Sequence, residues 1–242
     1  MILVDIGNTR IKWARHHAGI LEKMHAIVYI EQDITPLLLS AWQHLPRPDC
    51  IYFACVGPQG IKQLLIQLAE QIWPGVKLHE TYTQKIAHGV ENAYPKYTKL
   101  GVDRWLAMLA AYHYHTAPVC IVSCGSALTL DIVDEQGQHL GGMIMPGLSL
   151  MRLVLSKGTA NLNNCSEHYM PGLANDTEAA IYNGCLSAIR GFIEHGLAQY
   201  HQPASVILTG GDADFLANNL NLPAVIEAQL VLQGLALVAQ ES

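Results

Sequence analysis

The sequence predicts a mixed α/β protein whose two halves begin in the same way. Its N-terminal part runs through three strand-like segments, a helix, a strand, a helix and a strand, an order typical of a mixed sheet covered by helices. Residues 4–9 read VDIGNT and residues 122–127 read VSCGSA. Each run passes from a buried strand through a glycine and small residues into a return strand. This repeat predicts a structural duplication in which two glycine turns grip a polyphosphate from both sides.

The composition excludes several classes of partner. The chain has 242 residues, of which 50% are hydrophobic and 14% charged, and its net charge is −6. Without a run of Lys or Arg, nucleic acid is not expected as a partner. The apolar stretches are too short to cross a membrane. An acid at position 5 and the lack of a basic, then apolar leader indicate no signal peptide, so we expect a cytoplasmic protein.

The cysteines and histidines do not form metal-binding patterns. Cysteines without CxxC spacing in strand-like runs act as small apolar residues, which predicts a reducing compartment without disulfides or a zinc site. His113 and His115 are two residues apart on an expected helix and so do not face each other, which argues against a metal pair. The six cysteines are Cys50, Cys55, Cys120, Cys124, Cys165 and Cys185.

The first fifteen residues predict a β-hairpin. An apolar run over residues 1–6 meets a turn at residues 7–9 and then an alternating segment. Asp5 ends the first strand, where a carboxylate is costly unless it is paired, hydrated or holding a metal. The turn amides could cradle phosphate while Asp5 holds Mg²⁺ through water, with Thr9 and Lys12 nearby. An ordinary Asp-stabilised turn uses the same residue types, so both interpretations stay open.

The rest of the N-terminal half supplies a sheet and a polar segment. We expect strands over residues 19–29, 50–56 and 76–78, a helix over 33–44 and a second helix between Pro58 and Pro74. Residues 85–100 then read as an irregular loop of the kind that is often functional.

The loop leads into a helix that carries Asp103 and Arg104 in its first turn. Asp103 is either a helix cap or a functional acid. Because a helix N-terminus lowers the pKa of a carboxylate, we expect Asp103 to be a weak base.

The C-terminal half repeats the strand–turn–strand pattern. We expect strands over residues 118–124, 128–133, 138–145 and 205–208, and helices over 148–155, 177–200 and 226–239. Residues 157–173 are expected to form a loop over a site. Gly184 and Gly191 in the long helix suggest close packing, for example against another subunit. The run TGGDA at residues 209–213 would let a flat ring approach the backbone, although Gly-Gly-Asp is also ordinary turn chemistry.

Four motifs in one order resemble those of a known kinase family. They are DIGNTRIKWA from residue 5, LGVDRWLA from residue 100, GSALTLDIV from residue 125 followed by GGMIMPG, and TGGDA from residue 209. Together they resemble the type III pantothenate kinases of the acetate kinase, sugar kinase, Hsp70 and actin superfamily. LGVDRW is the motif that separates this family from sugar kinases and actins, and the match spans nearly the whole chain.

The resemblance implies two ribonuclease H-like domains, residues 1–116 and 117–242, with ATP in the cleft between them. It implies ATP-dependent phosphorylation of pantothenate to 4'-phosphopantothenate, the first step of coenzyme A biosynthesis. It also implies Mg²⁺ with ATP, a monovalent cation (K⁺ or NH₄⁺), and a homodimer with the pantothenate pocket near its interface.

The resemblance also implies roles for individual residues. Asp103 matches the catalytic base, and Asp5 lies near Mg²⁺. The residues matched to ATP binding are Asp5, Ile6, Gly7, Asn8, Thr9, Lys12, Gly125, Ser126, Ala127, Thr129, Gly210, Gly211 and Asp212. Those matched to pantothenate binding are Tyr94, Gly101, Val102, Asp103 and Arg104, with looser matches at Thr159 and Thr177.

The second phosphate motif departs from the family pattern. The family usually has Asp-x-Gly-Thr where this chain has Ser123-Cys124-Gly125-Ser126. Ser126 keeps a hydroxyl, whereas Ser123 replaces a carboxylate and so changes the expected monovalent-cation site.

Two alternatives to a pantothenate kinase remain at this point. A kinase for another small hydroxylated metabolite would share the superfamily motifs, but LGVDRW argues against it. A nucleotide-binding regulatory relative without kinase activity would fit the loss of the carboxylate at Ser123. Asp5, Asp103 and Arg104 are all present and argue against that second alternative.

Overall fold

The computed structural model describes residues 1–30, 32–158, 169, 170, 172–200, 202, 204–220 and 222–240. It divides into two compact units. The first contains residues 1–114, 136–138 and 229–242, and the second contains residues 115–135 and 139–228. Among the described residues, no helix is both long and apolar enough to cross a bilayer.

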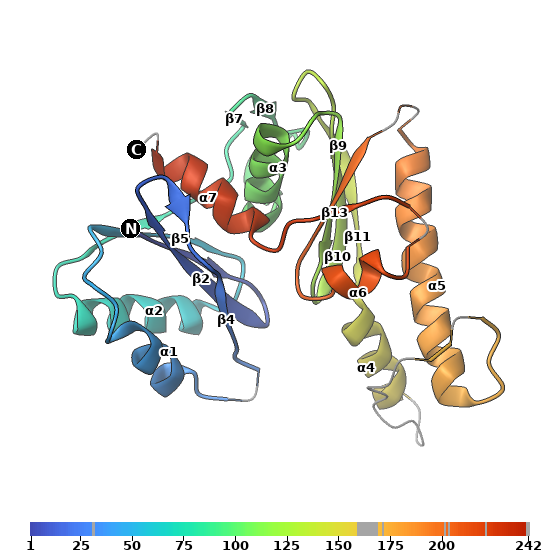
Figure 1. The fold of residues 1–242 in the computed structure, drawn as a ribbon, viewed down its shortest axis with the longest axis horizontal. Coiled ribbons are helices and arrows are strands. Elements are labelled where there is room, and N and C mark those ends of the chain that lie inside the picture. Colours follow the sequence, from blue (N-terminus) through green and yellow to red (C-terminus); the bar gives the residue numbers. More distant parts are fainter. Residues whose placement is uncertain are drawn as a thin grey trace. The chain divides into compact units, whose positions relative to one another are not determined.

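The first unit is built on a six-stranded mixed sheet with the order β3-β2-β1-β5-β6, in which β4 also pairs with β2 (Figure 1). The predicted hairpin is confirmed, because β1 and β2 are antiparallel and place Asp5 opposite Lys12. β1, β5 and β6 run parallel. The expected third strand is instead two short strands, β3 and β4. The strands are β1 (Ile2–Ile6), β2 (Arg10–His17), β3 (Ile20–Leu21), β4 (His25–Val28), β5 (Cys50–Cys55) and β6 (Lys77–Glu80).

Helices cover both faces of this sheet (Figure 1). α1 (Thr35–Trp42) and α2 (Gln59–Ile72) cover one face. Their apolar residues form one core with alternate residues of β1 and β5, including Ile2, Val4, Ile6, Phe53, Leu38, Trp42 and Leu65. α3 (Val102–Tyr114) and α7 (Leu230–Gln240) lie on the opposite face.

The last helix packs with the first unit. A Cβ built at Gly234 of α7 would lie 2.0 Å from the Leu106 carbonyl oxygen of α3, so the two helices touch through backbone. The resemblance implied domains of residues 1–116 and 117–242, whereas residues 229–242, which contain α7, belong to the same compact unit as α3. The physical reason is that α3 is buried all round, from Trp105 to Ala111, and needs apolar cover that its neighbours in sequence do not provide.

The segment expected to be an irregular loop contains short regular elements. β7 (Ile86–Ala87) and β8 (Val90–Glu91) form a small antiparallel pair, and a 3-10 turn η1 spans Tyr97–Lys99. Residues 136–138 pack against this pair, since the Glu91 N–H donates to the Gly137 carbonyl across 2.8 Å.

The second unit has a five-stranded sheet with the order β11-β10-β9-β12-β13. β9 and β10 are antiparallel, and β9, β12 and β13 run parallel. These pairings repeat those of β1 with β2 and of β1, β5 and β6, which confirms the predicted duplication. Strand β13 was not predicted. The strands are β9 (Val119–Cys124), β10 (Ala127–Val133), β11 (His139–Pro146), β12 (Ser205–Thr209) and β13 (Val225–Ile226).

A long helix covers one face of this second sheet. α5 (Thr177–Ala198) begins at Asp176, whose Oδ1 accepts the Ala179 N–H at 2.9 Å. Its residues Ile189 and Ile193 share a core with Leu130 of β10. α4 (Leu148–Gly158) contacts α5, and α6 (Ala213–Ala217) follows β12.

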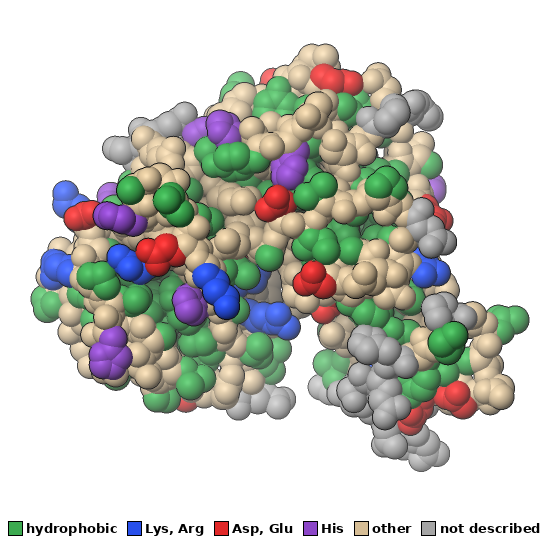
Figure 2. Space-filling view, in the orientation of Figure 1, with side chains coloured by type: hydrophobic (Ala, Val, Ile, Leu, Met, Phe, Trp, Pro, Cys, Tyr) green, Lys and Arg blue, Asp and Glu red, His purple; other side chains and the backbone are tan. Residues whose placement is uncertain are grey.

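Charged side chains are scattered rather than grouped by sign on the face drawn in Figure 2. There, Lys and Arg occur singly or in small groups among acidic and apolar side chains.

Candidate active site

The first unit gathers polar residues at the carboxyl ends of its parallel strands. In sheets of this kind, ligands bind outside the carboxyl ends of the strands. β1 leads into the turn over residues 7–9, which is closed by the Gly7 N–H donating to the Arg10 carbonyl across 3.0 Å. The Val56 and Gly57 N–H groups, after β5, both donate to the Ile6 carbonyl at 3.0 Å. The end of β5 is thereby tied to the start of the turn.

Asp5 is a buried carboxylate beside this turn. Only 3% of the residue is exposed, and its Oδ2 lies 3.3 Å from Lys12 Nζ. No cluster of three or more metal-binding side chains occurs in the described part of the chain. Mg²⁺ in phosphoryl-transfer sites is typically held by one or two carboxylates together with substrate phosphates and water. A single buried Asp beside this turn therefore fits Mg²⁺ that arrives with a nucleotide.

Asp103 lies in the first turn of α3, and Gly101 makes room for its side chain. A Cβ built at Gly101 would lie 2.6 Å from Asp103 Oδ1, so a larger residue would displace the carboxylate. The Trp105 N–H donates to the Gly101 carbonyl at 3.0 Å, which starts the helix. Asp103 is thus the second residue of α3, which begins at Val102, and it does not occupy the position before the helix where a capping side chain lies.

The pKa of Asp103 is raised above its usual value. Burial is the largest cause, and the nearby charge of Asp5 adds to it. The Arg104 N–H and the Arg104 charge oppose this rise without overcoming it. The expectation of a weak base was therefore wrong, because loss of solvent and a second carboxylate outweigh the helix terminus.

Arg104 and Tyr94 form a contact beside Asp103. Arg104 is 6% exposed, and its Nη1 donates to the Tyr94 hydroxyl across 3.2 Å. The fully buried Asn92 holds the other end of Tyr94, since its Oδ1 accepts the Tyr94 N–H at 2.9 Å. The structure thus brings together three residues that the resemblance matched to the substrate, Tyr94, Asp103 and Arg104.

A pocket of about 290 Å³ opens next to the start of α3. Gly101 and Val102 line it, as do residues that follow β5 and β6. A hydrogen bond and an ion pair stabilise its walls. Thr83 Oγ1 donates to the Leu100 carbonyl at 2.9 Å, and Lys62 Nζ lies 2.5 Å from Glu80 Oε2. The pocket is of the size of a small polar metabolite. The roles of Gly101 and Val102 stay predictions.

The second unit brings its two predicted nucleotide motifs together. The turn over residues 125–127 joins β9 to β10 and is closed by the Gly125 N–H donating to the Ala127 carbonyl at 3.2 Å. The Asp212 N–H donates to the Cys124 carbonyl at 3.1 Å. Gly210 has a φ of +99°, and a Cβ there would lie 2.3 Å from that carbonyl. Only glycine allows this approach, so Gly210–Asp212 lies next to the turn over residues 125–127.

Ser123 lies in a row of hydroxyl side chains. It pairs in register with Thr129 on β10 and with Thr209 on β12. The equivalent row in the first unit is Asp5 with Lys12 and Ala54, so the charged pair of one unit is replaced by hydroxyls in the other. Thr129 Oγ1 is buried and makes no hydrogen bond to the described residues.

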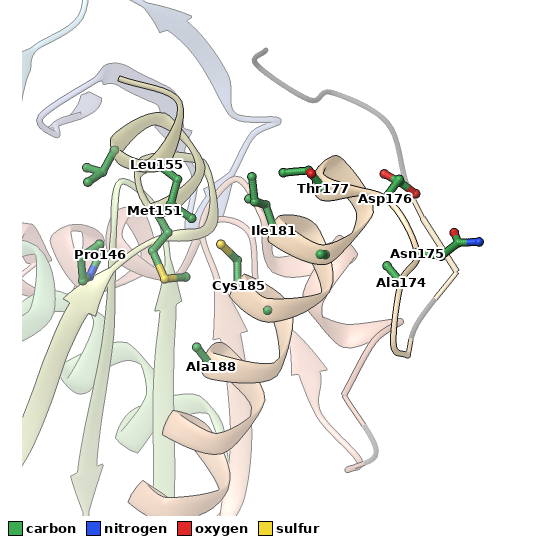
Figure 3. A pocket seen from close by; sticks show the side chains of 13 residues that line it. Pro146, Met151, Leu155, Ala174, Asn175, Asp176, Thr177, Ile181, Cys185 and Ala188 are labelled. Carbon is green, nitrogen blue, oxygen red and sulfur yellow. The ribbon is translucent and has the colours of Figure 1, made fainter. Parts of the chain in front are cut away.

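An apolar pocket of about 870 Å³ lies between α4 and α5 (Figure 3). Met151 of α4 and Cys185 of α5 face each other across it, and Pro146 of β11 adds to its wall. Thr177, which the resemblance matched to the substrate, lies on its rim at the start of α5. Thr177 belongs to the second unit and is not grouped with Tyr94 and Arg104 of the first. Thr159 lies outside the described residues.

Sequence reasoning missed Tyr29 and Gly57. Tyr29 follows β4, and its hydroxyl donates to the Gly7 carbonyl. A Cβ at Gly57 would lie 2.2 Å from that same carbonyl oxygen. Gly57 could have been noticed as a glycine at a strand end, but no local signal marks Tyr29, because its contact spans twenty-two residues of sequence.

Comparison with known proteins places these features in one family. The family model described as "Type III pantothenate kinase" matches residues 1–199. A type III pantothenate kinase from Nitrosococcus oceani is 35% identical over 252 residues, which cover 100% of this chain and 94% of the relative.

Solved structures agree at the level of the fold. A Baf family protein from Campylobacter jejuni is similar with a TM-score of 0.64 and 21% identity, over 100% of this chain and 98% of that one. The activator of the 2-hydroxyisocaproyl-CoA dehydratase from Clostridium difficile, solved with ADPNP, has a TM-score of 0.59 and 11% identity, over 99% of this chain and 94% of that one. The predicted two-domain α/β fold class is therefore confirmed. With the family match and the identity over its whole length, the chain belongs to the type III pantothenate kinase family.

Proposed function

We propose that this protein transfers the γ-phosphoryl group of ATP to the primary hydroxyl of pantothenate. The observation that carries the proposal is the grouping in the first unit of a glycine turn, a buried Asp5 and an Asp103 of raised pKa. The relatives named as type III pantothenate kinases supply the substrate.

Asp103 acts as the base in this proposal. Its carboxylate accepts a hydrogen bond from the pantothenate hydroxyl, orients that oxygen toward the phosphorus and takes its proton as the new bond forms. A raised pKa makes Asp103 a better proton acceptor near neutral pH than an ordinary aspartate. Because positioning and charge neutralisation supply most of the catalysis in phosphoryl transfer, Asp103 is sufficient as the only proton acceptor in this proposal.

Arg104 holds the other end of the substrate. Its guanidinium is buried and oriented by Tyr94, which suits a two-pronged contact with the pantothenate carboxylate. Gly101 and Val102 form the adjoining wall through the pocket at the start of α3. Thr177 and Thr159 remain further candidates for substrate contact.

The phosphates of ATP are assigned to the two glycine turns. The backbone N–H groups of Asn8 and Thr9, together with Lys12, bind from the first unit, with Gly7 shaping the turn because its own N–H bonds the Arg10 carbonyl. Residues 125–127 with Thr129 bind from the second. The segment Gly210–Asp212 receives the adenosine. Mg²⁺ would neutralise phosphate charge when bound, and Asp5 would hold it through water. Ile6 takes part in the site through its backbone only.

A monovalent cation is assigned to the hydroxyl row of the second unit. Ser123, Thr129 and Thr209 lie side by side in register, and the buried Thr129 oxygen supplies a ligand. Neutral oxygens bind K⁺ or NH₄⁺ more weakly than a carboxylate does, because they lack its charge. We therefore expect a higher cation requirement here than in relatives with aspartate at position 123.

We also propose that the protein is a homodimer that packs through α5. Ala180, Gly184 and Ala188 line the apolar pocket on that helix. Apart from the neighbouring backbone of α5 itself, no described atom lies within 4 Å of a Cβ built at Gly184 or Gly191, so this face has room for a second helix. Small residues allow such close backbone approach.

The cytoplasm is the location that suits this proposal. It supplies ATP and keeps thiols reduced. Cys50, Cys55, Cys120, Cys124 and Cys185 are free thiols in the structure.

The test is a coupled assay of ADP release with purified protein, Mg²⁺–ATP and K⁺. We expect turnover with pantothenate and background rates with other small hydroxy acids and sugars. If another acceptor is phosphorylated and pantothenate is not, that acceptor is the substrate and the proposed substrate is wrong. Nucleotide binding without phosphorylation of any acceptor would overturn the kinase proposal in favour of a regulatory relative.

A further inference from the structure

The first phosphate turn is held at both ends by one residue outside the recognised motifs. Tyr29 follows β4, at the point where the chain leaves the sheet. Its hydroxyl donates to the Gly7 carbonyl, and its backbone N–H donates to the Thr9 carbonyl at 3.1 Å. We propose that Tyr29 is a positioning residue that fixes the turn over residues 7–9 for the phosphates of ATP. This inference rests on the phosphate-binding role proposed above for that turn.

The geometry of the peptide bond explains what the hydroxyl achieves. In a planar trans peptide, a carbonyl and the following N–H point in opposite directions. Fixing the Gly7 carbonyl toward Tyr29 therefore fixes the Asn8 N–H away from it. The Gly7 N–H is already used by the Arg10 carbonyl at 3.0 Å, so Asn8 is the turn amide whose direction depends on Tyr29.

The environment keeps Tyr29 a hydrogen-bond donor. The residue is 9% exposed, and burial raises the pKa of its hydroxyl to about 12, with further contributions from Cys55 and Asp5. A phenol of that pKa stays protonated throughout the neutral range. The Gly7 carbonyl is thus held by a donor that does not titrate.

Gly57 provides the space for this contact. A Cβ built at position 57 would lie 2.2 Å from the Gly7 carbonyl oxygen and 2.8 Å from the Tyr29 hydroxyl. Any larger residue would push apart the two groups that the hydrogen bond joins.

The second unit supports its own turn from the same side by different means. β11 pairs with β10 as β4 pairs with β2, and the residue after β11 is Gly147. The Gly147 N–H donates to the Ser126 carbonyl at 2.9 Å, whereas the Tyr29 N–H donates to the carbonyl of Thr9, one position further along the turn. A Cβ at Gly147 would lie 2.0 Å from the Gly125 carbonyl oxygen. The backbone of Gly147 therefore packs against the turn over residues 125–127, whereas the phenol of Tyr29 contacts the turn over residues 7–9.

The experiment removes only the hydroxyl, through Tyr29→Phe. We expect the KM for ATP, and the Kd for a Mg²⁺-bound non-hydrolysable ATP analogue measured by calorimetry, to rise roughly 3- to 10-fold, the effect of one hydrogen bond. The KM for pantothenate should stay within about twofold, since the change acts at the phosphate turn. The matched control is Tyr52→Phe, a buried tyrosine on β5 whose ring stacks on His79.

Several outcomes would overturn the inference. An unchanged Kd for the ATP analogue in folded Tyr29→Phe protein would do so. Equal rises in the KM for ATP and the KM for pantothenate would do so as well, as would an equal rise of the analogue Kd in Tyr52→Phe. If Tyr29→Phe does not fold, Gly57→Ala decides: a weaker analogue Kd supports the inference and an unchanged Kd overturns it. A parent protein that binds the analogue but does not phosphorylate pantothenate would overturn the proposed substrate alone, because the calorimetric comparison still stands. A parent protein that does not bind the analogue would overturn both proposals.

Discussion

Arg104 Nη1 donates to the hydroxyl of Tyr94 across 3.2 Å, and the guanidinium carbon lies 5.9 Å from the centroid of the same ring. The contact joins the polar segment before η1 to the first turn of α3. Because Asn92 fixes the Tyr94 backbone, the ring is a firm support for the arginine. The direction of the Arg104 fork is thus set by a segment that precedes it by ten residues.

Replacing Arg104 should weaken pantothenate binding specifically. Removing a charge-assisted contact in Arg104→Ala should raise the KM for pantothenate by roughly 10- to 100-fold, and Tyr94→Phe by roughly 2- to 5-fold. The KM for ATP should change little in both. Steady-state kinetics checks this, with Arg47→Ala as the control, since the exposed Arg47 bonds the Pro74 carbonyl away from the site. Equal losses for both substrates would contradict the assignment.

Replacing Asp103 with asparagine should remove the base and leave nucleotide binding. Turnover should fall roughly 10²- to 10⁴-fold, the usual contribution of a general base. The Kd for a Mg²⁺-bound ATP analogue should stay near that of the parent. Asp33→Asn is the matched control, because Asp33 is an exposed acid of the same unit that bonds Thr35. Turnover within a few-fold of the parent in folded Asp103→Asn would sink the catalytic assignment.

The raised pKa of Asp103 also predicts how stability depends on pH. A carboxyl with a folded pKa above its unfolded value, 3.8, binds its proton more tightly in the folded state. The stability that it contributes is complete below the unfolded pKa and is lost as pH rises through the folded pKa. Asp103→Asn, which cannot ionise, should therefore be at least as stable as the parent at pH 7.5 and lose that advantage near pH 4. Urea unfolding at both pH values measures this, and an Asn variant clearly less stable at pH 7.5 would refute it.

Restoring a carboxylate at position 123 should lower the need for a monovalent cation. Ser123→Asp places a charge between Thr129 and Thr209, where the parent has hydroxyls alone. We expect half-maximal activity at a several-fold lower K⁺ concentration, on the order of the effect of one added charge near the surface. Ser126→Ala would serve as a comparison at the neighbouring turn. Identical K⁺ titrations for parent and Ser123→Asp would remove Ser123 from the cation site.

A bulky residue on α5 should prevent dimerisation. The parent is expected at twice its chain mass of 26.5 kDa in light scattering, and Gly184→Arg at the mass of a single chain. Gly60→Arg is the matched control, because Gly60 also lies on a helix and no described atom outside the neighbouring helix backbone lies within 4 Å of its Cβ position. A monomeric parent at micromolar concentration, or a dimeric Gly184→Arg, would count against the proposed interface.

Local patterns in the sequence determined much of the fold and the position of the turns. The alternation around Gly7 predicted the β1–β2 hairpin, because side chains on a strand alternate between its faces. The same pattern at Gly125 predicted the duplication, and the two units show it in the order of their strands. The sequence also predicted Asp103 in the first turn of a helix, because the periodicity of apolar residues that indicates a helix is a local property.

Tertiary structure decided what depends on contacts between distant segments. The packing of α3 against α7 could not be read locally, since more than a hundred residues separate the two helices. The raised pKa of Asp103 depends in the same way on burial in the fold and on the charge of Asp5. The short strand β13 exists because β12 provides its partner. Tyr29 has no motif around it and gains its role from the Gly7 carbonyl. Periodicity and turn chemistry are properties of neighbouring residues, whereas burial, charge proximity and hydrogen bonds across the sheet arise only after the chain has folded.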